Sequence, residues 1–351
     1  MDPFIEQLQA QVQQASQQGA KLQIRGRNSL GLSAKRPPES CLSLAGWQGV
    51  VEFEPGELAI TVRSGTGWSE LLAVLAQHGQ QPACDPLTAG LDRTVGGVVA
   101  TGFNGLARPW LGDVRGAVLG VAMLNGRGQL LTFGGRVMKN VAGFDLARLQ
   151  AGAWGLFGPL LEISLRTRPS SQCRSARVLE LSLEQALQRM YTMRTLPLTG
   201  LVWCDTRLHV RLEGLEPAVR QAEHELGGDA DEPGWWQALE RHRLPLFTTG
   251  PLYRILLPAG HALMPQLAGL GPALVDWGGA QLWLQAELTT AQRAAIRAAG
   301  GWCAQWPAAG PQFTHGSQRE LTERLRHAFD PHRLFQPEFH TREDADADPA
   351  A

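Results

Sequence analysis

The sequence lacks the cysteine patterns that hold metal clusters or disulfide frameworks. Its five cysteines stand far apart, with no CxxC pair and no Cys/His spacing typical of a metal site: Cys41, Cys84, Cys173, Cys204 and Cys303. Iron–sulfur clusters are held by closely spaced thiolates, so we expect none on this chain. Isolated cysteines of this kind typically act as small buried apolar residues in a reducing compartment.

Long apolar runs and a strong charge of either sign are also absent. Apolar runs such as residues 117–124 are far shorter than the ~20 residues of a membrane-spanning helix. The first residues are acidic and glutamine-rich, unlike a secretory signal peptide. A net charge of −1 with no clustered basic stripe argues against nucleic-acid binding. We therefore expect a cytoplasmic globular protein without a transmembrane segment.

The 351 residues are too many for one ordinary core, which predicts two domains. Before residue 170 the pattern predicts a helix at 3–18, another at 67–79, strands at 58–65 and 158–169, and a hairpin over 116–135. After residue 171 a β-α-β-β-α pattern occurs twice, which predicts one antiparallel sheet with helices on one face. We expect four parts, at residues 1–170, 171–312, 313–342 and an acidic, disordered tail at 343–351.

Glycine is concentrated where the chain is otherwise apolar. Sixteen of the 40 glycines lie between Gly90 and Gly158, and six fall in "GGRVMKNVAGFDLARLQAGAWGLFG" at residues 134–158, beside residues that would fill a core. Glycine carries an entropic cost on folding. The pattern therefore suggests that another group approaches the backbone closely.

Three glycine-rich segments share this character. "RGRNSLG" (25–31) follows a strand, and its Gly26 and Asn28 tolerate left-handed conformations, so its N–H groups suit an anion such as a pyrophosphate; a simple turn has the same composition. "DPLTAGLDRTVGGVVATGFNG" (85–105) suits a flat ligand or a tightly packed turn. The glycines at 152, 155 and 158 suit a ligand or close helix packing. The sequence contains neither GxxxxGK[ST] nor a GxGxxG after a strand in a short βαβ unit, which disfavours a nicotinamide Rossmann domain.

The order of these segments over residues 20–170 resembles the FAD-binding domain of the vanillyl-alcohol oxidase/PCMH flavoprotein superfamily. "GGRVMKNVAGFDLARL" is most similar to the glycolate oxidase branch of FAD-linked 2-hydroxy-acid dehydrogenases, and the length is similar to that of the smaller FAD-binding component of that complex. The resemblance implies an α+β protein. It would have a two-part PCMH-type FAD-binding domain, a smaller α/β cap domain and a C-terminal segment returning to the FAD domain.

The resemblance also implies which residues contact FAD. Around the pyrophosphate it places Arg25, Gly26, Arg27, Asn28, Ser29 and Leu30, and against the flavin and ribityl chain Thr94, Gly96, Gly97, Thr101, Gly102, Asn104 and Gly105. Around the isoalloxazine and adenosine it places Asp113, Val118, Gly120, Gly152, Gly155, Leu156 and Gly158. A family signature is matched by Lys139, Asn140, Gly143 and Asp145. The resemblance implies either that a cation of this signature lies near the flavin or that Lys139 forms a structural ion pair with Asp145. No histidine occupies 25–31, so we expect non-covalent FAD.

The catalytic residues are harder to identify. Oxidation of a 2-hydroxy acid needs flavin N5 to accept hydride, a cation for the carboxylate and a base for the hydroxyl proton. The nine histidines form no HxH or HxxE/H cluster, so we expect no metal site. "LRHAFDPHRLFQPEF" (325–339) resembles the family's closing motif, with Gln336 and Glu338 in place of its Asn and Gly. Its His332 and Arg333 are the candidates that remain.

Three functions fit this resemblance. The first is the FAD-binding subunit of a multi-subunit glycolate oxidase, which would pass electrons from glycolate through flavin to an iron–sulfur subunit and a quinone. Its partners would be a larger FAD-binding catalytic subunit and the iron–sulfur subunit, and any membrane contact is expected through them. The second is a stand-alone FAD-dependent dehydrogenase of a small 2-hydroxy acid. The third is a non-catalytic scaffold with the flavoprotein fold.

Overall fold

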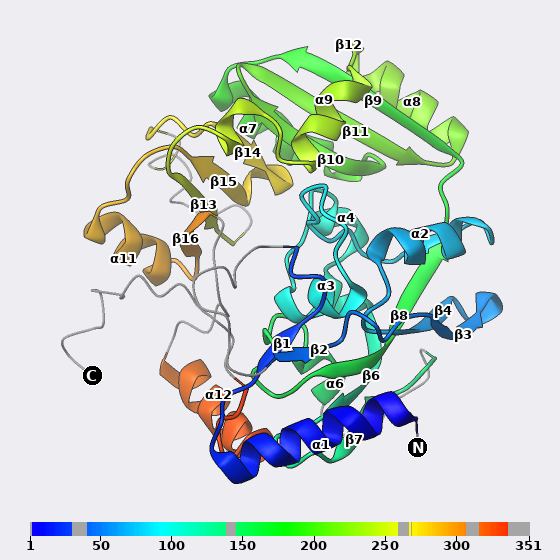
Figure 1. The fold of residues 1–351 in the computed structure, drawn as a ribbon. Coiled ribbons are helices and arrows are strands. Elements are labelled where there is room, and N and C mark those ends of the chain that lie inside the picture. The colour runs from blue at the N-terminus through cyan, green and yellow to red at the C-terminus, as the bar shows by residue number, and fades with distance from the viewer. Residues whose placement is uncertain are drawn as a thin grey trace.

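The computed structural model describes residues 2–29, 41–137, 145–258, 267, 269–306 and 316–335 (Figure 1). The molecule has two large antiparallel sheets in two separate parts, one above the other in the view of Figure 1. The lower one, in the N-terminal part, has the strand order β3-β4-β8-β6-β7, and β5 also pairs with β8. Its strands are β3 (Val50–Glu54), β4 (Ala59–Arg63), β5 (Gln80–Pro82), β6 (Val118–Leu124), β7 (Leu130–Gly134) and β8 (Leu160–Pro169).

Short helices cover this sheet and close its core. They are α2 (Trp68–Ala76), α3 (Val95–Thr101), α5 (Val114–Ala117) and α6 (Leu146–Leu149), whereas α4 (Arg108–Leu111) contacts strand β10 (Leu198–Cys204) of the second sheet. Leu71 and Leu75 of α2 and Val98 of α3 pack with Ile60 and Ile163 of the strands. Burial of such side chains is the main driving force for this packing.

The expected hairpin forms between β6 and β7, with Leu124 opposite Leu130. Its connection is longer than a two-residue Asn-Gly turn. Asn125 Oδ1 accepts hydrogen bonds of 2.9 Å from the backbone N–H groups of both Arg127 and Gln129, and Gly128 takes a φ of +73°. The asparagine thus orders a five-residue loop, because its side chain replaces main-chain partners.

A smaller unit flanks the first sheet. Helix α1 (Pro3–Gln18) begins at the capping residue Asp2, and strands β1 (Gln23–Arg25) and β2 (Cys41–Ser43) pair in parallel. The C-terminal helix α12 (Gly316–Phe329) packs on the core of the first sheet, where the ring of Phe329 lies 5.8 Å from that of Phe133 and 5.6 Å from that of Phe157. After it, Leu334 accepts a 2.8 Å backbone hydrogen bond from Leu22. The end of the described chain therefore returns to the N-terminal part.

The second sheet is the cap, with the order β12-β9-β11-β10-β14-β15-β13-β16. Its strands are β9 (Cys173–Glu180), β10 (Leu198–Cys204), β11 (Arg207–Gly214), β12 (Asp229–Ala230), β13 (Leu252–Leu256), β14 (Leu274–Asp276), β15 (Gln281–Leu284) and β16 (Trp302–Trp306). The two sequence repeats form its two halves and meet where β10 pairs with β14. The α+β fold class with an antiparallel, helix-covered cap is therefore confirmed.

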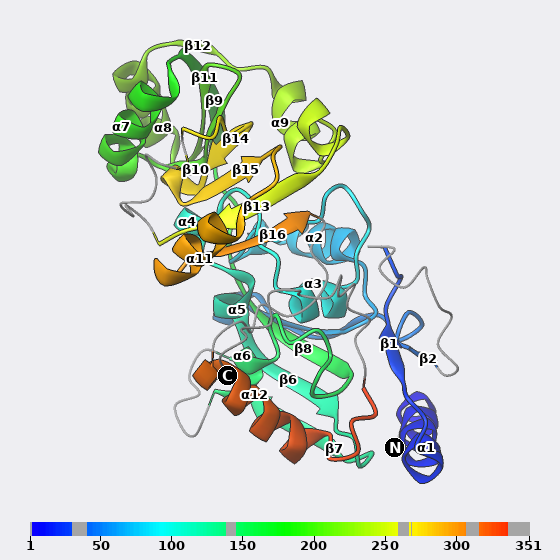
Figure 2. The ribbon, with the colours of Figure 1, turned by 90° about the vertical axis from the view of Figure 1, so that its left-hand side faces the viewer.

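One feature of the cap differs from the expectation. Helices α7 (Leu183–Thr192), α8 (Glu216–Leu226) and α11 (Thr290–Ala298) pack on one face, but α9 (Pro233–Glu240) lies on the opposite face (Figure 2). Trp236 and Leu239 of α9 pack there with Val202 and Leu252. The expectation of helices on one face only was wrong, because an apolar pair of side chains in the linker between the repeats covers the second face.

Candidate functional site

The glycine-rich segments meet around a cavity of about 160 Å³ in the N-terminal part. Strand β1 ends beside it, α3 begins beside it, and the turn before β8 closes it. Its lining includes Ile24, Gly26, Leu44, Ser64, Thr94, Gly96, Gly97, Ala100, Thr101, Trp154, Gly155, Gly158 and Leu160. Residues from all three glycine-rich segments thus face one space.

Several of these glycines are required by contacts within the protein. A Cβ at Gly26 would lie 2.5 Å from the Thr94 hydroxyl, and one at Gly96 would lie 2.8 Å from Ser64 Cβ. A Cβ at Gly102 would lie 2.9 Å from the Gly152 nitrogen. The glycines therefore bring segments of the chain together, and the cavity remains between them.

The turn at 152–158 is not a helix-packing motif. Gly152, Gly155 and Gly158 have φ values of +82°, +77° and +133°. Trp154 between them has a φ of +54°. These are left-handed conformations that glycine adopts at no steric cost, so the repeat of glycine every three residues reflects a tight turn.

Ser64 is a cavity residue that the sequence reading missed. It directly follows β4, its exposed fraction is 1%, and its Oγ is buried without a hydrogen-bond partner among the described residues. An unsatisfied buried hydroxyl costs roughly 1–3 kcal/mol. The hydroxyl therefore fits a site in which a polar ligand supplies the missing partner. In the sequence, the only indication of this role was that Ser64 is a small residue at the end of a predicted strand.

Arg93 was also missed. It is buried, and its guanidinium donates to Leu87 O at 2.8 Å, Gly97 O at 3.2 Å and Thr101 Oγ1 at 2.6 Å. Burial lowers the pKa of Arg93 to about 10, so the side chain stays charged at neutral pH. It places a fixed positive charge behind the cavity wall formed by α3.

The remaining predicted residues are placed in several ways. Arg27 pairs with Asp92, and Arg25 donates to Gln23 Oε1 at 2.7 Å. Asp113 caps α5, and Val118 and Gly120 lie in β6. Asn28 and Ser29 follow β1 without lining the cavity, and Leu156 is buried beside it. Leu30, Lys139, Asn140 and Gly143 lie outside the described residues; Asp145 caps α6 by accepting from Arg148 N at 3.1 Å.

The two catalytic candidates are not at this cavity. Arg333 Nη2 pairs with Glu323 Oε2 at 2.5 Å, and the carbonyls of His332 and Arg333 accept from Lys21 Nζ at 3.5 and 3.0 Å. Neither residue lines this cavity or the second one described below. Their catalytic role stays a prediction, because neither side chain lines either of the two cavities that could hold flavin or substrate.

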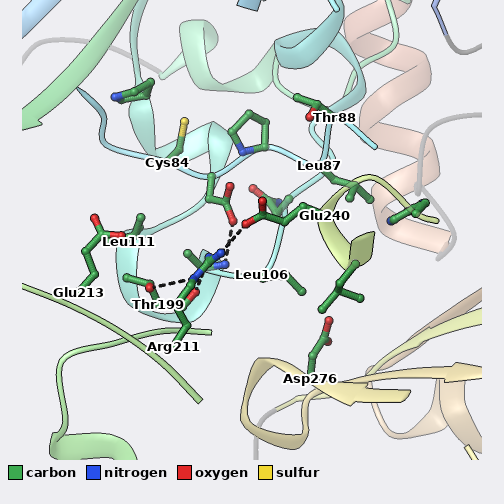
Figure 3. Close-up of a pocket in the computed structure, with 18 of the residues that line it drawn as sticks. Cys84, Leu87, Thr88, Leu106, Leu111, Thr199, Arg211, Glu213, Glu240 and Asp276 are labelled. Atoms are coloured by element: carbon green, nitrogen blue, oxygen red, sulfur yellow. Dashed lines mark hydrogen bonds and ion pairs between the residues drawn. The ribbon is translucent and has the colours of Figure 1, made fainter. Parts of the chain in front are cut away.

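A second cavity, of about 260 Å³, lies between the N-terminal part and the face of the cap that carries α9 (Figure 3). We refer to it as the interdomain cavity. Asp85, Asn104 and Gly105 line it from the N-terminal part. Thr199, Arg211, Glu240, His242, Asp276 and Gln281 line it from the cap. Two residues predicted to contact flavin, Asn104 and Gly105, therefore border this space.

Charged side chains in this region are buried. Arg254 is 2% exposed, surrounded by the rings of Phe103, Trp277, Trp283 and Trp306, and its Nε donates to Gln281 Oε1 at 2.6 Å. The Gln281 amide donates to both Asp276 oxygens, at 2.7 and 2.8 Å. Burial raises the pKa of Asp276 to about 7 and lowers that of His242 to about 4, so His242 is neutral at physiological pH.

The cap also holds the 102–105 segment directly. Trp277 Nε1 donates to Gly105 O at 2.8 Å, and Arg254 Nη2 donates to Asn104 O at 3.4 Å.

Among the described residues, no group of three His, Cys, Asp or Glu side chains could hold a metal ion. In the same part of the chain, no helix is long and apolar enough to span a bilayer.

Comparison with known proteins identifies a relative over nearly the whole chain and others over part of it. A family model described as an FAD binding domain matches residues 5–134. The glycolate oxidase subunit GlcE of Escherichia coli (strain K12) is 37% identical over 95% of this chain and 96% of its own length. The Bacillus subtilis glycolate oxidase subunit GlcD is 26% identical over 36% of this chain and 26% of that protein.

A solved structure shows the same fold. An alkyldihydroxyacetonephosphate synthase superposes with a TM-score of 0.67 and 15% identity, covering 94% of this chain and 73% of that one. The expected PCMH-type fold and FAD as the cofactor are thus confirmed. The chain belongs to the family of FAD-linked oxidoreductase subunits represented by the glycolate oxidase subunit GlcE.

Proposed function

We propose that this chain is the FAD-binding subunit of a multi-subunit glycolate oxidase that converts glycolate to glyoxylate. The observation that carries the proposal is the near full-length match to GlcE, together with a glycine-lined cavity whose buried Ser64 hydroxyl has no partner in the part of the chain that the structure describes. The partners would be a larger FAD-binding catalytic subunit and an iron–sulfur subunit that passes electrons to a quinone. The complex would be cytoplasmic, with any membrane contact made through these partners.

The residues at the first cavity fit part of a flavin dinucleotide. Gly26, Gly97 and Gly155 expose main chain there, Ser64 and Thr101 offer hydroxyl groups, and Arg93 supplies positive charge from behind. The volume is below the ~300–1,000 Å³ typical of complete ligand sites, so this space would take a portion of the cofactor. Bound FAD would supply a hydride acceptor, while this chain's own residues would bind it, orient it and shield it from water.

The proposed FAD contacts are the predicted residues that line the cavity, with Ser64 added: Gly26, Ser64, Thr94, Gly96, Gly97, Thr101, Gly155 and Gly158. Gly102, Asp113 and Gly120 are assigned a supporting role, because each makes a close contact or a cap within the protein. We propose non-covalent attachment, because residues 25–31 contain no histidine for the covalent link.

The residues around the two cavities support a dependence of glycolate oxidation on partner subunits. The C-terminal candidates His332 and Arg333 lie away from both. A stand-alone 2-hydroxy-acid dehydrogenase is the second candidate, and one observation favours it: Arg211 and the carboxyl of Asp85 face the same interdomain space. A cation and a carboxyl are two of the groups that such an oxidation requires.

The experiment is to purify the chain alone and together with the two proposed partner subunits, and to follow flavin absorbance and dye reduction with glycolate. We expect the chain alone to be yellow and inert to glycolate, and the assembled complex to be active. Bleaching of flavin by glycolate in the isolated chain would support the stand-alone dehydrogenase. A colourless chain that takes up no FAD would contradict the proposal.

A further inference from the structure

We infer that the interdomain cavity binds a small monocarboxylate of the 2-hydroxy-acid class on Arg211, and that Glu240 occupies the same guanidinium edge when no ligand is present. The choice of a 2-hydroxy acid rests on the proposed function. The location of the site rests on the geometry of Arg211, Glu240 and Asp85.

Arg211 is held as a binding group rather than as a mobile surface charge. Its side chain is 11% exposed. Its Nε donates to Thr199 Oγ1 at 3.2 Å, and its Nη2 donates to Thr199 O at 3.0 Å. The guanidinium also lies over the Trp236 ring, 5.0 Å from the centroid. Two sides are thus fixed by β10 and α9, and the Nη1 edge points toward Glu240 (Figure 3).

Glu240 is suited to be displaced from that edge. It is the last residue of α9, where the helix dipole disfavours an anion. Its side chain is 48% exposed, in contrast to the mostly buried Arg211. Release into water therefore costs Glu240 little, while Arg211 needs a replacement anion. A fixed guanidinium edge is well shaped for a carboxylate, so a ligand can take this place.

The rest of the cavity suits a small acid. Its volume of about 260 Å³ is below the ~300–1,000 Å³ of sites for larger ligands. The neighbouring charges are committed elsewhere: Arg174 pairs with Glu213, and Asp276 accepts from Gln281. Asp85 accepts from Ala107 N at 2.8 Å, and burial raises the pKa of its carboxyl. The raised pKa favours the uncharged form of Asp85, which repels a ligand carboxylate less than the ionised form does.

The location also connects the ligand to the proposed cofactor site. Asn104 and Gly105 line this cavity, while Gly97 and Thr101 of the same segment line the glycine cavity. An acid held on Arg211 would therefore lie on the other side of the segment expected against flavin.

The test is calorimetric titration of the purified chain with glycolate, with ethylene glycol as the analogue that lacks the carboxylate. We expect glycolate to bind and ethylene glycol not to bind. R211Q should weaken binding at least tenfold, and E240Q should strengthen it several-fold because the internal competitor is removed. R220Q is the matched control, since Arg220 is an exposed residue of α8; it should leave glycolate binding unchanged.

Equal binding by the wild type and a folded R211Q would overturn the inference. If R211Q does not fold, E240Q decides: binding that is unchanged or weaker would overturn the role of Glu240 and with it the site. Titrations with and without added FAD separate this inference from the proposed function. A yellow chain, active in the complex, that binds no glycolate alone would refute the inference only. A colourless chain with Arg211-dependent glycolate binding would refute the proposed function only.

Discussion

The glycine-lined cavity and the interdomain cavity are built from different chemical groups. The cavity in the N-terminal part is lined by main chain, hydroxyl groups and glycines whose missing side chains let segments touch. The cavity below the cap is lined by charged side chains that are held by other side chains. Main-chain N–H and C=O groups suit an elongated cofactor that makes many weak contacts, whereas a fixed guanidinium suits a small ion. Variants at the first cavity should therefore change flavin retention, and variants near the second should change stability as a function of pH.

The largest effect is expected from G155V. Gly155 has a φ of +77°, which valine adopts only with strain, and a Cβ there would lie 2.9 Å from Ile24 Cδ1. The variant should lose flavin absorbance while the cap keeps its secondary structure. G56A is the control, since Gly56 does not have a left-handed φ and nothing lies within 4 Å of a Cβ there. A G155V protein that stays fully yellow would refute the placement of FAD.

The next effect concerns Asp276. The unfolded chain loses this proton near pH ~3.9, whereas the folded protein keeps it up to about pH 7 because the carboxyl is buried. Folded molecules bind more protons within this window, so stability should fall as pH rises through it, by up to ~1.4 kcal/mol per pH unit. Urea unfolding across the window should show a flatter pH dependence for D276N than for the wild type. Parallel profiles would show that Asp276 is not the titrating group.

A smaller effect is expected at the joint between the two parts. Glu213 of β11 is 4% exposed and accepts from Gln81, Ser171, Arg168 and Arg174 at 2.7–3.1 Å. Burial alone would raise its pKa, but the hydrogen bonds from Ser171 and Gln81 and the charge of Arg174 lower it. E213Q should cost ~2 kcal/mol of unfolding free energy.

The contribution of Glu213 has the opposite pH dependence to that of Asp276. A lowered folded pKa means that its stabilisation is present above the unfolded pKa and is lost as pH falls through the folded value. The difference in unfolding free energy between the wild type and E213Q should therefore shrink in acid. A difference that is independent of pH would contradict this assignment.

The smallest effect separates ligand binding from stability. S64A removes a buried hydroxyl that has no hydrogen-bond partner among the described residues, so the FAD-free variant should be unchanged or more stable by up to ~1 kcal/mol. Its FAD affinity should fall, by about fivefold to tenfold, because the ligand loses a hydrogen bond. Thermal unfolding with and without FAD measures both quantities. Equal FAD affinity would place the cofactor away from Ser64.

Much of the fold could be predicted from the sequence, because it depends on local patterns. The period of apolar residues located α1 and the repeat of the cap, and the Asn125-Gly126 pair located the β6–β7 hairpin. Ser64 could not be found in this way, since it is buried beside segments distant in the chain. Arg93 could not be found either, because its partners are close in sequence but its burial is set by the tertiary structure. Likewise, the reason for glycine at Gly96 and Gly102 lies in contacts with Ser64 and Gly152, which only the tertiary structure brings together.

The position of α9 was missed for a related reason. The run that contains Trp236 and Leu239 is short and joins two repeats, so its pattern does not tell which face of the sheet it covers. That helix carries Glu240 and covers the face where Arg211 and Arg254 lie. The interdomain cavity could therefore not be predicted from the sequence, whereas the concentration of glycine indicated the glycine-lined cavity.

The most direct test of the central claim, that FAD is held non-covalently among the glycines, is the visible spectrum of the purified chain before and after acid precipitation. We predict a flavin spectrum in the native protein, with the flavin released into the supernatant when the protein is precipitated. A chain that shows no flavin absorbance even after incubation with FAD, or one whose flavin remains with the precipitate, would contradict this claim.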